Sequence, residues 1–557
     1  MNIKTVCDLF EENRDISFHN QAYAYMRYMA GHHDAISETM GYEKDGVWFD
    51  QRNGDLPRYC DIVIEPGIQG VQNHIQVNSR IMIQNTVFSE PDIMIECENS
   101  QVAAVQKAWF KRRWENGGWG TDFFQGGMEV EAAGISFFEL GIRDGRASLR
   151  HQSVLDTVWD QSTRNPNDWE FVFFRRRISP LAAMRKYNMT QEQVDEVTDK
   201  VTVQGDKNGV PRSEITEWVF WTPNYHVLFL GGVSCEHRNI FILNEQNEYI
   251  QINALDPDEK VPAQEFLCGP NPFGIIPSAT WVESWTPGSM APASKLATTW
   301  RMASWVNVLE LYIKETIKRD LPFTVIAGSA FGEEQRKAIA SAKSISDIGT
   351  ILVTEDDVSD LSKVVRKVEG GQLSPAWLAA LQYAKEQLNA ATGIKDAERG
   401  IPLPGERSAL EVRTLNASSG GQARHMRIRF AAALKEIASK LKFMGSQYES
   451  TREVLYADGI VFNTAQHDLT AVLAVPSAID ISEGSLSSKT VEELTHEAYQ
   501  QFQLVDMQAI NTGVGNPFAI FEGMYNKLGV ANGKKFLLTP EELQENAIRQ
   551  QQQQPTE

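Results

Sequence analysis

The chain has 557 residues, of which 42% are hydrophobic and 23% charged, with 53 Lys and Arg against 73 Asp and Glu for a formal net charge of −20. This composition is that of a globular protein, and it excludes a wholly disordered or collagen-like chain. Because a single hydrophobic core stops growing at roughly 250–300 residues, we expect more than one domain. The acidic balance argues against a protein that grips nucleic acid over its whole surface, since Lys and Arg supply most of the affinity for duplex DNA.

Cysteine use and the first residues indicate a cellular compartment. Five cysteines are scattered through the chain with no CxxC pair, a pattern that predicts reduced thiols, an intracellular protein and no structural zinc. The first thirteen residues carry three acidic side chains and no long apolar run, so we expect neither a secretory signal nor a transit peptide. The protein is therefore expected to stay in the cytoplasm in which it is made.

The chain up to about Gly134 has a mostly helical pattern, with helices expected over residues 101–114 and 122–133. Aromatic side chains gather in this region: Trp109, Phe110, Trp114, Trp119, Phe123 and Phe124. We interpret them as a core at a helix–helix corner, because aromatic side chains bury large areas. A surface that stacks on sugars or bases is the alternative.

From Ile135 to about Trp285 the apolar residues recur with a period of two, which is typical of strands. Strands are predicted over residues 136–142, 169–177, 215–222, 225–230 and 239–243, with a short helical insert over 180–197. One strand contains Arg175, Arg176 and Arg177. Since side chains alternate faces along a strand, at least one arginine must point away from the others. We expect this strand to be solvated or paired with another subunit, and phosphate contact is the alternative.

A long helix is predicted from Ala293 to Asp320, because Pro322 cannot continue it. At about 1.5 Å per residue the helix would reach roughly 42 Å. An apolar stripe at spacings of three and four residues consists of Met302, Val306, Leu309, Ile313 and Ile317. Such a stripe suits packing against another helix, and a core within a monomer is the competing interpretation.

A second helix is predicted from Ser374 to Gly393, with signals at both ends. Ser374 can cap it, Pro375 suits its first position, and Gly393 can adopt the left-handed conformation that ends a helix. Its apolar stripe consists of Trp377, Leu381, Ala384, Leu388 and Ala391. The residues between the two helices read as a small α/β insert, with strands over 323–326, 350–353 and 361–368 and a helix over 333–342. We expect the two helices to pair and to carry the insert outward on a stalk.

An acidic cluster lies in the insert, in a turn between strands: Glu355, Asp356, Asp357 and Asp360. It lacks the alternating ligand spacing and the central glycine of a calcium loop. A solvated turn or a docking surface for a partner is therefore the preferred interpretation, and no metal site is predicted.

Residues 394–407 read as a loop rich in proline, glycine and charge, and a long helix follows from Ser408 to about Met444. This helix carries seven basic residues against two acidic ones, which makes it the one clearly basic segment of an acidic chain. Beyond it, residues 460–481 alternate like strands and short helices follow from Thr490. The glutamine-rich residues 544–557 are typical of a flexible tail.

The motifs of several enzyme classes are absent. No GxxxxGK[ST] phosphate loop occurs, which argues against ATP hydrolysis. Glu236 stands where a nucleophile elbow around Ser234 needs a glycine. Neither His32 nor His496 has a histidine partner at the spacing of a metal-binding helix. Residues distant in the sequence can still converge in space, so an unmarked site stays open.

Four local sequence patterns follow one another along the chain. They are the extended run from His151 to Asp160, the strand of 169–180 that leads into a short helix, Ala391 to Ile394 followed by Gly400, and Arg407 to Val412 at the start of the next helix. The predicted elements follow in the order of a β-rich region, a long helix, a small α/β insert, a second helix, a charged loop and a long basic helix. With these local patterns, and over roughly residues 21–529, this order resembles the portal proteins of tailed bacteriophages, also called head-to-tail connectors. Leu410 departs from the pattern, because many members have a small hydroxyl residue before the glutamate.

The resemblance implies an α+β, portal-like fold. Residues 1–286 would form a wing that is helical at first and β-rich from about 135, and residues 287–320 and 374–393 two stem helices that bracket an α/β clip at 321–373. Residues 394–407 would be the tunnel loop, and 408–488 the long basic helix and the return of the wing. A helical crown would take residues 489–543, before the flexible tail at 544–557.

The resemblance also implies a function. Portal proteins form a dodecameric ring at one capsid vertex, where double-stranded DNA passes during packaging and ejection, and they are not enzymes. The implied partners are further copies of the chain, the major capsid and scaffolding proteins, the large terminase subunit and the tail adaptors, with no cofactor and no membrane. The implied location is the virion, assembled in the host cytoplasm. The channel residues would be those of the tunnel loop: Lys395, Asp396, Glu398, Arg399, Glu406 and Arg407.

An acidic chain with mixed charge in its channel suits a conduit, since many neutralised phosphates would hold DNA tightly and oppose sliding. Ordinary surface charge is the competing interpretation of the loop residues. Two other functions stay open. One is a soluble multidomain hydrolase acting on carbohydrate, for which 13 tryptophans and abundant carboxylates are the motive. The other is a different virion component, such as a tail tube or adaptor protein.

Overall fold

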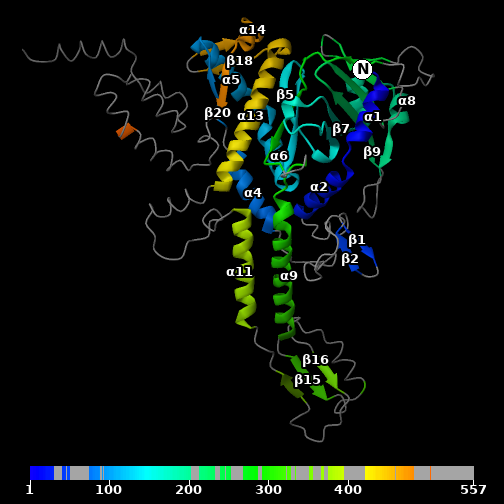
Figure 1. Cartoon of the computed structure of the whole chain (residues 1–557), viewed down its shortest axis with the longest axis vertical. Coiled ribbons are helices and arrows are strands. Elements are labelled where there is room, and N and C mark those ends of the chain that lie inside the picture. Colours follow the sequence, from blue (N-terminus) through cyan, green and yellow to red (C-terminus); the bar gives the residue numbers. More distant parts are fainter. Residues whose placement is uncertain are drawn as a thin grey trace, which may run out of the picture. The chain divides into compact units, whose positions relative to one another are not determined.

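The computed structural model contains both helices and sheets (Figure 1). It describes residues 1–30, 41–44, 47–50, 74–87, 91, 93–201, 212–231, 239–244, 246, 248–252, 267–285, 291–320, 323–327, 333, 351–354, 365–368, 374–393, 421–457, 460–481 and 502–503. The chain divides into two units, Met1–Leu486 and Ser487–Glu557. The elements below all belong to the first unit. The predicted crown and tail lie outside the described residues, except for residues 502–503.

The N-terminal part is mostly helical, as predicted. Its helices are α1 (Ile3–Asn13), α2 (Ile16–Met29), α4 (His74–Val87), α5 (Ser100–Gly117) and α6 (Trp119–Ala133). Strands also occur there, namely a hairpin of β1 (Gly41–Lys44) and β2 (Val47–Asp50), and β3 (Ile93–Glu96). A single residue, Gly118, separates α5 from α6. Its φ of 67° is a left-handed conformation that glycine adopts at less cost than other residues, so a glycine suits this position.

Two antiparallel sheets follow. The smaller has the order β14-β4-β5, formed by β4 (Ile135–Arg143), β5 (Arg146–Gln152) and β14 (Ser278–Val282). The larger has the order β12-β11-β10-β9-β7-β6, with β13 paired to β10 and β8 to β9. Its strands are β6 (Thr157–Trp159), β7 (Val172–Ile178), β8 (Asp199–Val201), β9 (Arg212–Trp221), β10 (Tyr225–Leu230), β11 (Ile240–Leu243), β12 (Tyr249–Gln251) and β13 (Gly269–Pro270).

The strand predictions for this region are confirmed in position, with two corrections. A 3₁₀ turn, η2 (Val154–Asp156), interrupts the run that was expected to be extended from His151 to Asp160. A second turn, η3 (Pro166–Asp168), delays the start of β7 to Val172. Between the strands, the predicted insert consists of α7 (Pro180–Tyr187) and α8 (Gln191–Val197).

The two predicted long helices are present as α9 (Leu296–Asp320) and α11 (Pro375–Thr392). The hydroxyl of Ser294 accepts a hydrogen bond from the amide of Ala297 at 3.2 Å, so α9 begins three residues later than expected. The end signals of α11 are confirmed: the Ser374 hydroxyl accepts from the Ala376 amide, Pro375 occupies the first turn and Gly393 has a φ of 74°.

Three strands of the predicted insert are described: β15 (Phe323–Ala327), β16 (Ile351–Thr354) and β17 (Val365–Val368). They form a sheet of order β16-β15-β17, with β15 parallel to β16 and antiparallel to β17. Of the predicted helix over residues 333–342, only Glu333 is described, and it is helical.

The long basic segment is helical over α13 (Gly421–Tyr448), and residues 394–420 lie outside the description. It is followed by β18 (Val454–Ala457), β19 (Ile460–Asn463), α14 (Leu469–Ala474) and β20 (Ala478–Ile481), and β20 pairs with β3. The prediction of strands throughout residues 460–481 is therefore wrong in its middle. The Asp468 carboxylate caps α14 by accepting from the amides of Thr470 and Ala471.

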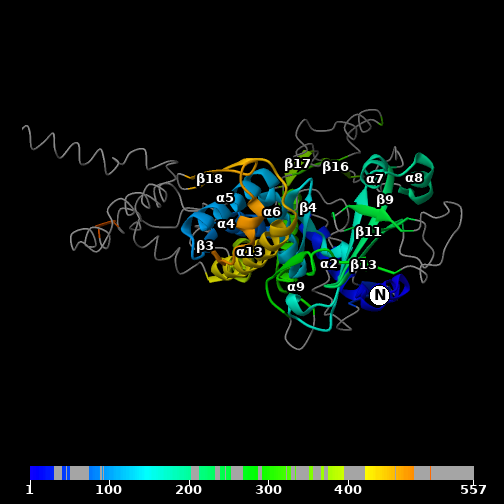
Figure 2. The same cartoon turned by 90° about the horizontal axis from the view of Figure 1, so that it is seen from above.

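Helix α13 lies against the smaller sheet and beside α4, α5 and α6 (Figure 2). Phe430 on α13 packs against Trp281 of β14 and Phe123 of α6, with ring centroids 4.8 and 5.2 Å apart. One continuous hydrophobic core therefore joins helices from both ends of the first unit to both sheets.

Candidate functional site

Helices α9 and α11 lie side by side and run in opposite directions (Figure 1). The rings of Tyr312 and Trp377 have centroids 4.5 Å apart, and Lys385 Nζ lies 2.7 Å from Glu310 Oε1. As the residue number rises along α9 it falls along α11, so the pair is antiparallel. The segment between them therefore leaves and returns at the same end of the pair.

The apolar stripes predicted on these helices meet inside the chain. Val306, Leu309 and Ile313 are buried on α9, and Ala384 and Leu388 are buried on α11. Most of these side chains belong to a second hydrophobic core, to which α2 contributes Tyr25 and Tyr28, α4 Ile75 and α6 Ala132. Of the remaining stripe residues, Leu381 and Ala391 are half-buried, and Met302, Ile317 and Trp377 are exposed.

Polar contacts fix the helix pair to the rest of the first unit. The Glu310 carboxylate lies 3.1 Å from His74 Nε2 of α4 and 2.7 Å from Lys385 Nζ. Burial alone would raise the pKa of Glu310, but the hydrogen bond from Lys385 and the charge of His74 outweigh it, so the pKa is lowered. The Asn78 amide of α4 also donates to the Thr392 hydroxyl of α11 at 3.1 Å. Helix α4 thus contacts both members of the pair through polar side chains.

Beside the buried stripe, α9 presents a row of exposed apolar side chains. Trp305 and Tyr312 are each 49% exposed, and their spacing of seven residues places them on one face of the helix. Met302 lies near this row, three residues before Trp305. Exposed apolar patches of this kind mark surfaces that bind another molecule. The sequence prediction missed Trp305 and Tyr312, although their spacing of seven was available as a signal.

The predicted channel and docking residues lie outside the described part of the chain. They are Lys395, Asp396, Glu398, Arg399, Glu406 and Arg407 of the predicted tunnel loop and Glu355, Asp356, Asp357 and Asp360 of the predicted clip. Their roles remain predictions.

Several basic side chains of α13 are used within the chain. Lys440 donates to the Ser278 carbonyl at 2.7 Å and pairs with Glu436 at 2.6 Å. Lys442 is buried and donates to the Val475 carbonyl at 2.7 Å. The basic excess of this helix is therefore partly consumed by intramolecular contacts, while Arg429 is exposed.

The arginine run on β7 has a different environment from the one expected. Strand β7 is central, because β6 and β9 flank it, and Arg176 is only 5% exposed. Arg176 contacts Glu139 at 2.7 Å and Glu217 at 2.9 Å. Arg175, on the other face, donates to Asp156 at 2.6 Å, and Arg177 is exposed. The alternation of faces is confirmed, and the prediction of a solvated or subunit-paired strand is wrong because both edges of β7 are already paired within the chain.

The aromatic cluster of α5 and α6 is mainly core. Trp109, Phe110, Trp119 and Phe123 are buried, which confirms the preferred interpretation for these four. The other two, Trp114 and Phe124, are half-buried.

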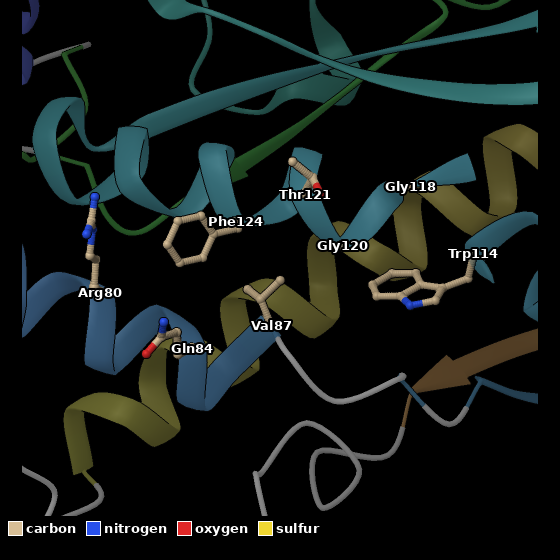
Figure 3. A pocket seen from close by; sticks show the side chains of 8 residues that line it. All are labelled: Arg80, Gln84, Val87, Trp114, Gly118, Gly120, Thr121 and Phe124. Atoms are coloured by element: carbon tan, nitrogen blue, oxygen red, sulfur yellow. The ribbon is translucent and has the colours of Figure 1, made fainter. Parts of the chain in front are cut away.

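Trp114 and Phe124 line a pocket of about 540 Å³ between α4, α5 and α6 (Figure 3). In Figure 3 the Phe124 ring extends from α6 toward the helix that carries Arg80, Gln84 and Val87. The Trp114 ring already stacks on Phe123, with centroids 5.2 Å apart and planes 17° apart. One face of the indole is thus occupied, which leaves less of it for stacking on a ligand.

Among the described residues, no group of three or more His, Cys, Asp or Glu side chains is arranged to hold a metal ion. No helix in this part of the chain is both long enough and apolar enough to cross a membrane. Cys7, Cys97 and Cys268 form no disulfide bond.

Comparison with known proteins gives two structural likenesses. No family model matches the chain, and no curated protein matches it. A chain from the neck of an empty gene transfer agent particle is similar at a TM-score of 0.38 and 10% identity, over 79% of this chain and 89% of that one. A chain from the virion of a native gene transfer agent particle is similar at 0.33 and 10% identity, over 66% of this chain and 76% of that one. Both TM-scores lie below 0.5, so no conclusion rests on these likenesses.

Proposed function

We propose that this protein is a virion structural protein that forms a portal ring at one vertex of a tailed-phage capsid. The single observation that carries the proposal is the antiparallel pair of α9 and α11, which brackets a small sheet and bears an exposed aromatic row. The order of elements supports it as well, since a β-rich region precedes the pair and a long basic helix follows it.

The geometry suits assembly into a ring. Because the pair is antiparallel, it can hold residues 321–373 away from the sheets as a clip at one end of a stem. The row of Trp305 and Tyr312 provides an apolar surface for a neighbouring copy, whereas the buried stripes hold each stem together internally. A contact between two different surfaces of identical chains closes into a ring when the rotation allows it. We propose twelve copies by the resemblance to portal proteins.

In this proposal the ring is a conduit and a docking platform rather than an enzyme. Double-stranded DNA passes through the centre, past the tunnel loop that contains Lys395, Arg399 and Arg407. Their mixture with Asp396 and Glu398 limits the attraction to phosphates, which a conduit must not bind tightly. The clip docks the terminase and later the tail adaptors, and the ring joins the capsid and scaffolding proteins during assembly in the host cytoplasm.

The carboxylates of the cavity between the two sheets do not favour the hydrolase alternative. A glycosidase needs a carboxyl group kept protonated by a raised pKa. Among the carboxylates in the cavity between the two sheets, Glu139 and Glu217 both pair with Arg176. Burial raises the pKa of Glu217, but Arg176 and Lys186 lower it further, so Glu217 is ionised and a poor general acid.

The proposal is tested on the purified full chain by light scattering and negative-stain imaging. We expect a closed homo-oligomer that appears end-on as a ring with a central hole. A compact monomer at all concentrations and salt levels, also after co-expression with the capsid and scaffolding proteins, would contradict the proposal. Turnover of a glycan in a panel of substrates would favour the hydrolase instead.

A further inference from the structure

A cavity of about 280 Å³ lies between the β14-β4-β5 sheet and the larger sheet, in a part of the molecule to which the proposed function assigns no role. Six charged side chains line it: Arg143, Arg150, Arg176, Lys186, Glu139 and Glu217. The four cations exceed the two carboxylates by two. This local excess of positive charge occurs in a chain whose net charge is −20.

Both carboxylates already have partners. Glu139 accepts from Arg176 Nη1 at 2.7 Å and from Gln152 Nε2 at 2.9 Å. Glu217 lies 2.9 Å from Arg176 Nε and 2.5 Å from Lys186 Nζ, and it also accepts from the Tyr187 hydroxyl. Glu139 also lies 3.7 Å from Arg143 Nη2, so Arg176, Lys186 and Arg143 share the two carboxylates and two positive charges stay in excess.

Two guanidinium groups can donate to a ligand in this cavity, Arg150 at its exposed side and Arg176 in its buried part. Arg150 stands directly opposite Glu139 in the pairing of β4 and β5, and its side chain lines the cavity while it is exposed to solvent on its other side. Burial, and then repulsion by Arg176, lower the pKa of Arg150. The Nη2 atom of Arg176 is buried without a hydrogen-bond partner. Burial would lower the pKa of this guanidinium, but Glu139, Glu217 and a hydrogen bond with Tyr249 outweigh it and raise the pKa. A buried donor such as Nη2 of Arg176 is nearly always satisfied in proteins, because an unpaired one has lost its hydrogen bond to water without compensation.

We infer that this cavity binds one small oxyanion of the phosphate class, held by Arg150 and by the free Nη2 of Arg176. Arginine guanidinium groups form short, charge-assisted hydrogen bonds with phosphate oxygens. The cavity is smaller than the roughly 300–1,000 Å³ typical of drug-sized ligands, so an ion of this size fits it better than a nucleotide does. Arg176 is buried, while the side chains of Arg143 and Lys186 are 50% and 39% exposed, so an anion can enter past these two.

The anion can come from two sources, free inorganic phosphate or the terminal phosphoryl group of a small phosphomonoester. Both supply the same chemistry, namely a doubly charged group with several acceptor oxygens. The excess of two cations matches that charge.

The inference is tested by isothermal titration of the full chain with sodium phosphate, at constant ionic strength set with sodium chloride. We expect saturable binding of one phosphate per subunit. Arg150→Gln should weaken it at least tenfold. Arg146→Gln is the matched control, because Arg146 is exposed on the same strand and does not line the cavity, and it should change the affinity less than twofold. A parallel titration with glycerol 2-phosphate distinguishes the sources: similar affinity supports a phosphoryl group, and much weaker affinity supports the free ion.

Thermal unfolding provides a second readout that does not depend on titration heats. In phosphate-free buffer, Arg150→Gln should unfold at the temperature of the wild type or above it, because a repulsive charge is removed. Phosphate should raise the unfolding temperature of the wild type, since a ligand that binds only the folded state stabilises it, and should not raise that of the variant. If Arg150→Gln fails to fold, Arg143→Gln should still weaken binding severalfold. Absence of saturable binding above the chloride baseline, or an equal loss in Arg146→Gln, would overturn the inference.

Discussion

Replacing Trp305 by Gln tests whether the exposed row on α9 is the contact between subunits. Complete burial of a tryptophan removes up to about 250 Å² from water. Trp305 is 49% exposed in the single chain, so a neighbouring copy that covers it would bury about 120 Å² more. At about 25 cal/mol per Å² this burial contributes ~3 kcal/mol to each contact, which corresponds to roughly 100-fold in the association constant.

The assay is light scattering of the full chain over a dilution series, with negative-stain imaging at each mass. We expect Trp305→Gln to shift ring dissociation to concentrations about 100-fold higher than in the wild type. Leu181→Gln is the control, since Leu181 on α7 is 76% exposed and lies away from α9 and α11 in sequence and contacts. Circular dichroism must show that both variants are folded, because the covered half of Trp305 packs within its own chain. Rings of unchanged mass and unchanged dissociation in Trp305→Gln would refute the role of this row.

Three further predictions concern the first unit. Arg176→Met should destabilise the first unit by about 3–5 kcal/mol, because the buried carboxylates of Glu139 and Glu217 lose their shared partner. Urea unfolding measures this change, and an unchanged midpoint would mean that water reaches both carboxylates. The lowered pKa of Glu310 contributes stability that is present above the unfolded pKa of about 4.3 and is lost as the pH falls through the folded pKa. The difference in unfolding temperature between wild type and Glu310→Gln should therefore be largest near pH 6 and shrink toward pH 3, and a constant difference would contradict this assignment. Gly134→Ala should lower the free energy of unfolding by more than about 1 kcal/mol, because Gly134 has a φ of 85° and an added Cβ would lie 2.6 Å from the Ala293 carbonyl oxygen. Gly120→Ala is the control: its added Cβ meets nothing within 4 Å, so the free energy of unfolding should not fall.

The elements with strong local signals were predictable. The ends of α11 follow from Ser374, Pro375 and Gly393, each of which acts through its own backbone geometry or hydrogen bond. Strand β10 was predicted with its observed bounds, because turn residues flank a short apolar run. Local chemistry of this kind needs no knowledge of distant residues.

Predictions failed where a distant neighbour decides the outcome. Residues 469–474 became the helix α14, because the Asp468 cap and packing against α13 outweigh the apparent alternation. The sequence could place Arg176 on one face of a strand, but not next to Glu139, which lies 37 positions away on another sheet. The cavity with excess positive charge was therefore invisible in the sequence.

The sequence by itself determined that two long amphipathic helices bracket a small insert, because periodicity and capping residues are local properties. It also determined that the chain is acidic with one basic helix. Only the tertiary structure decided which part of the wide apolar surface of α9 is covered within the chain. Val306 and Leu309 are buried against neighbouring helices, and Trp305, one position away from Val306, stays half-exposed. The physical reason is that periodicity gives the apolar arc of a helix, while burial depends on which other elements pack against that arc.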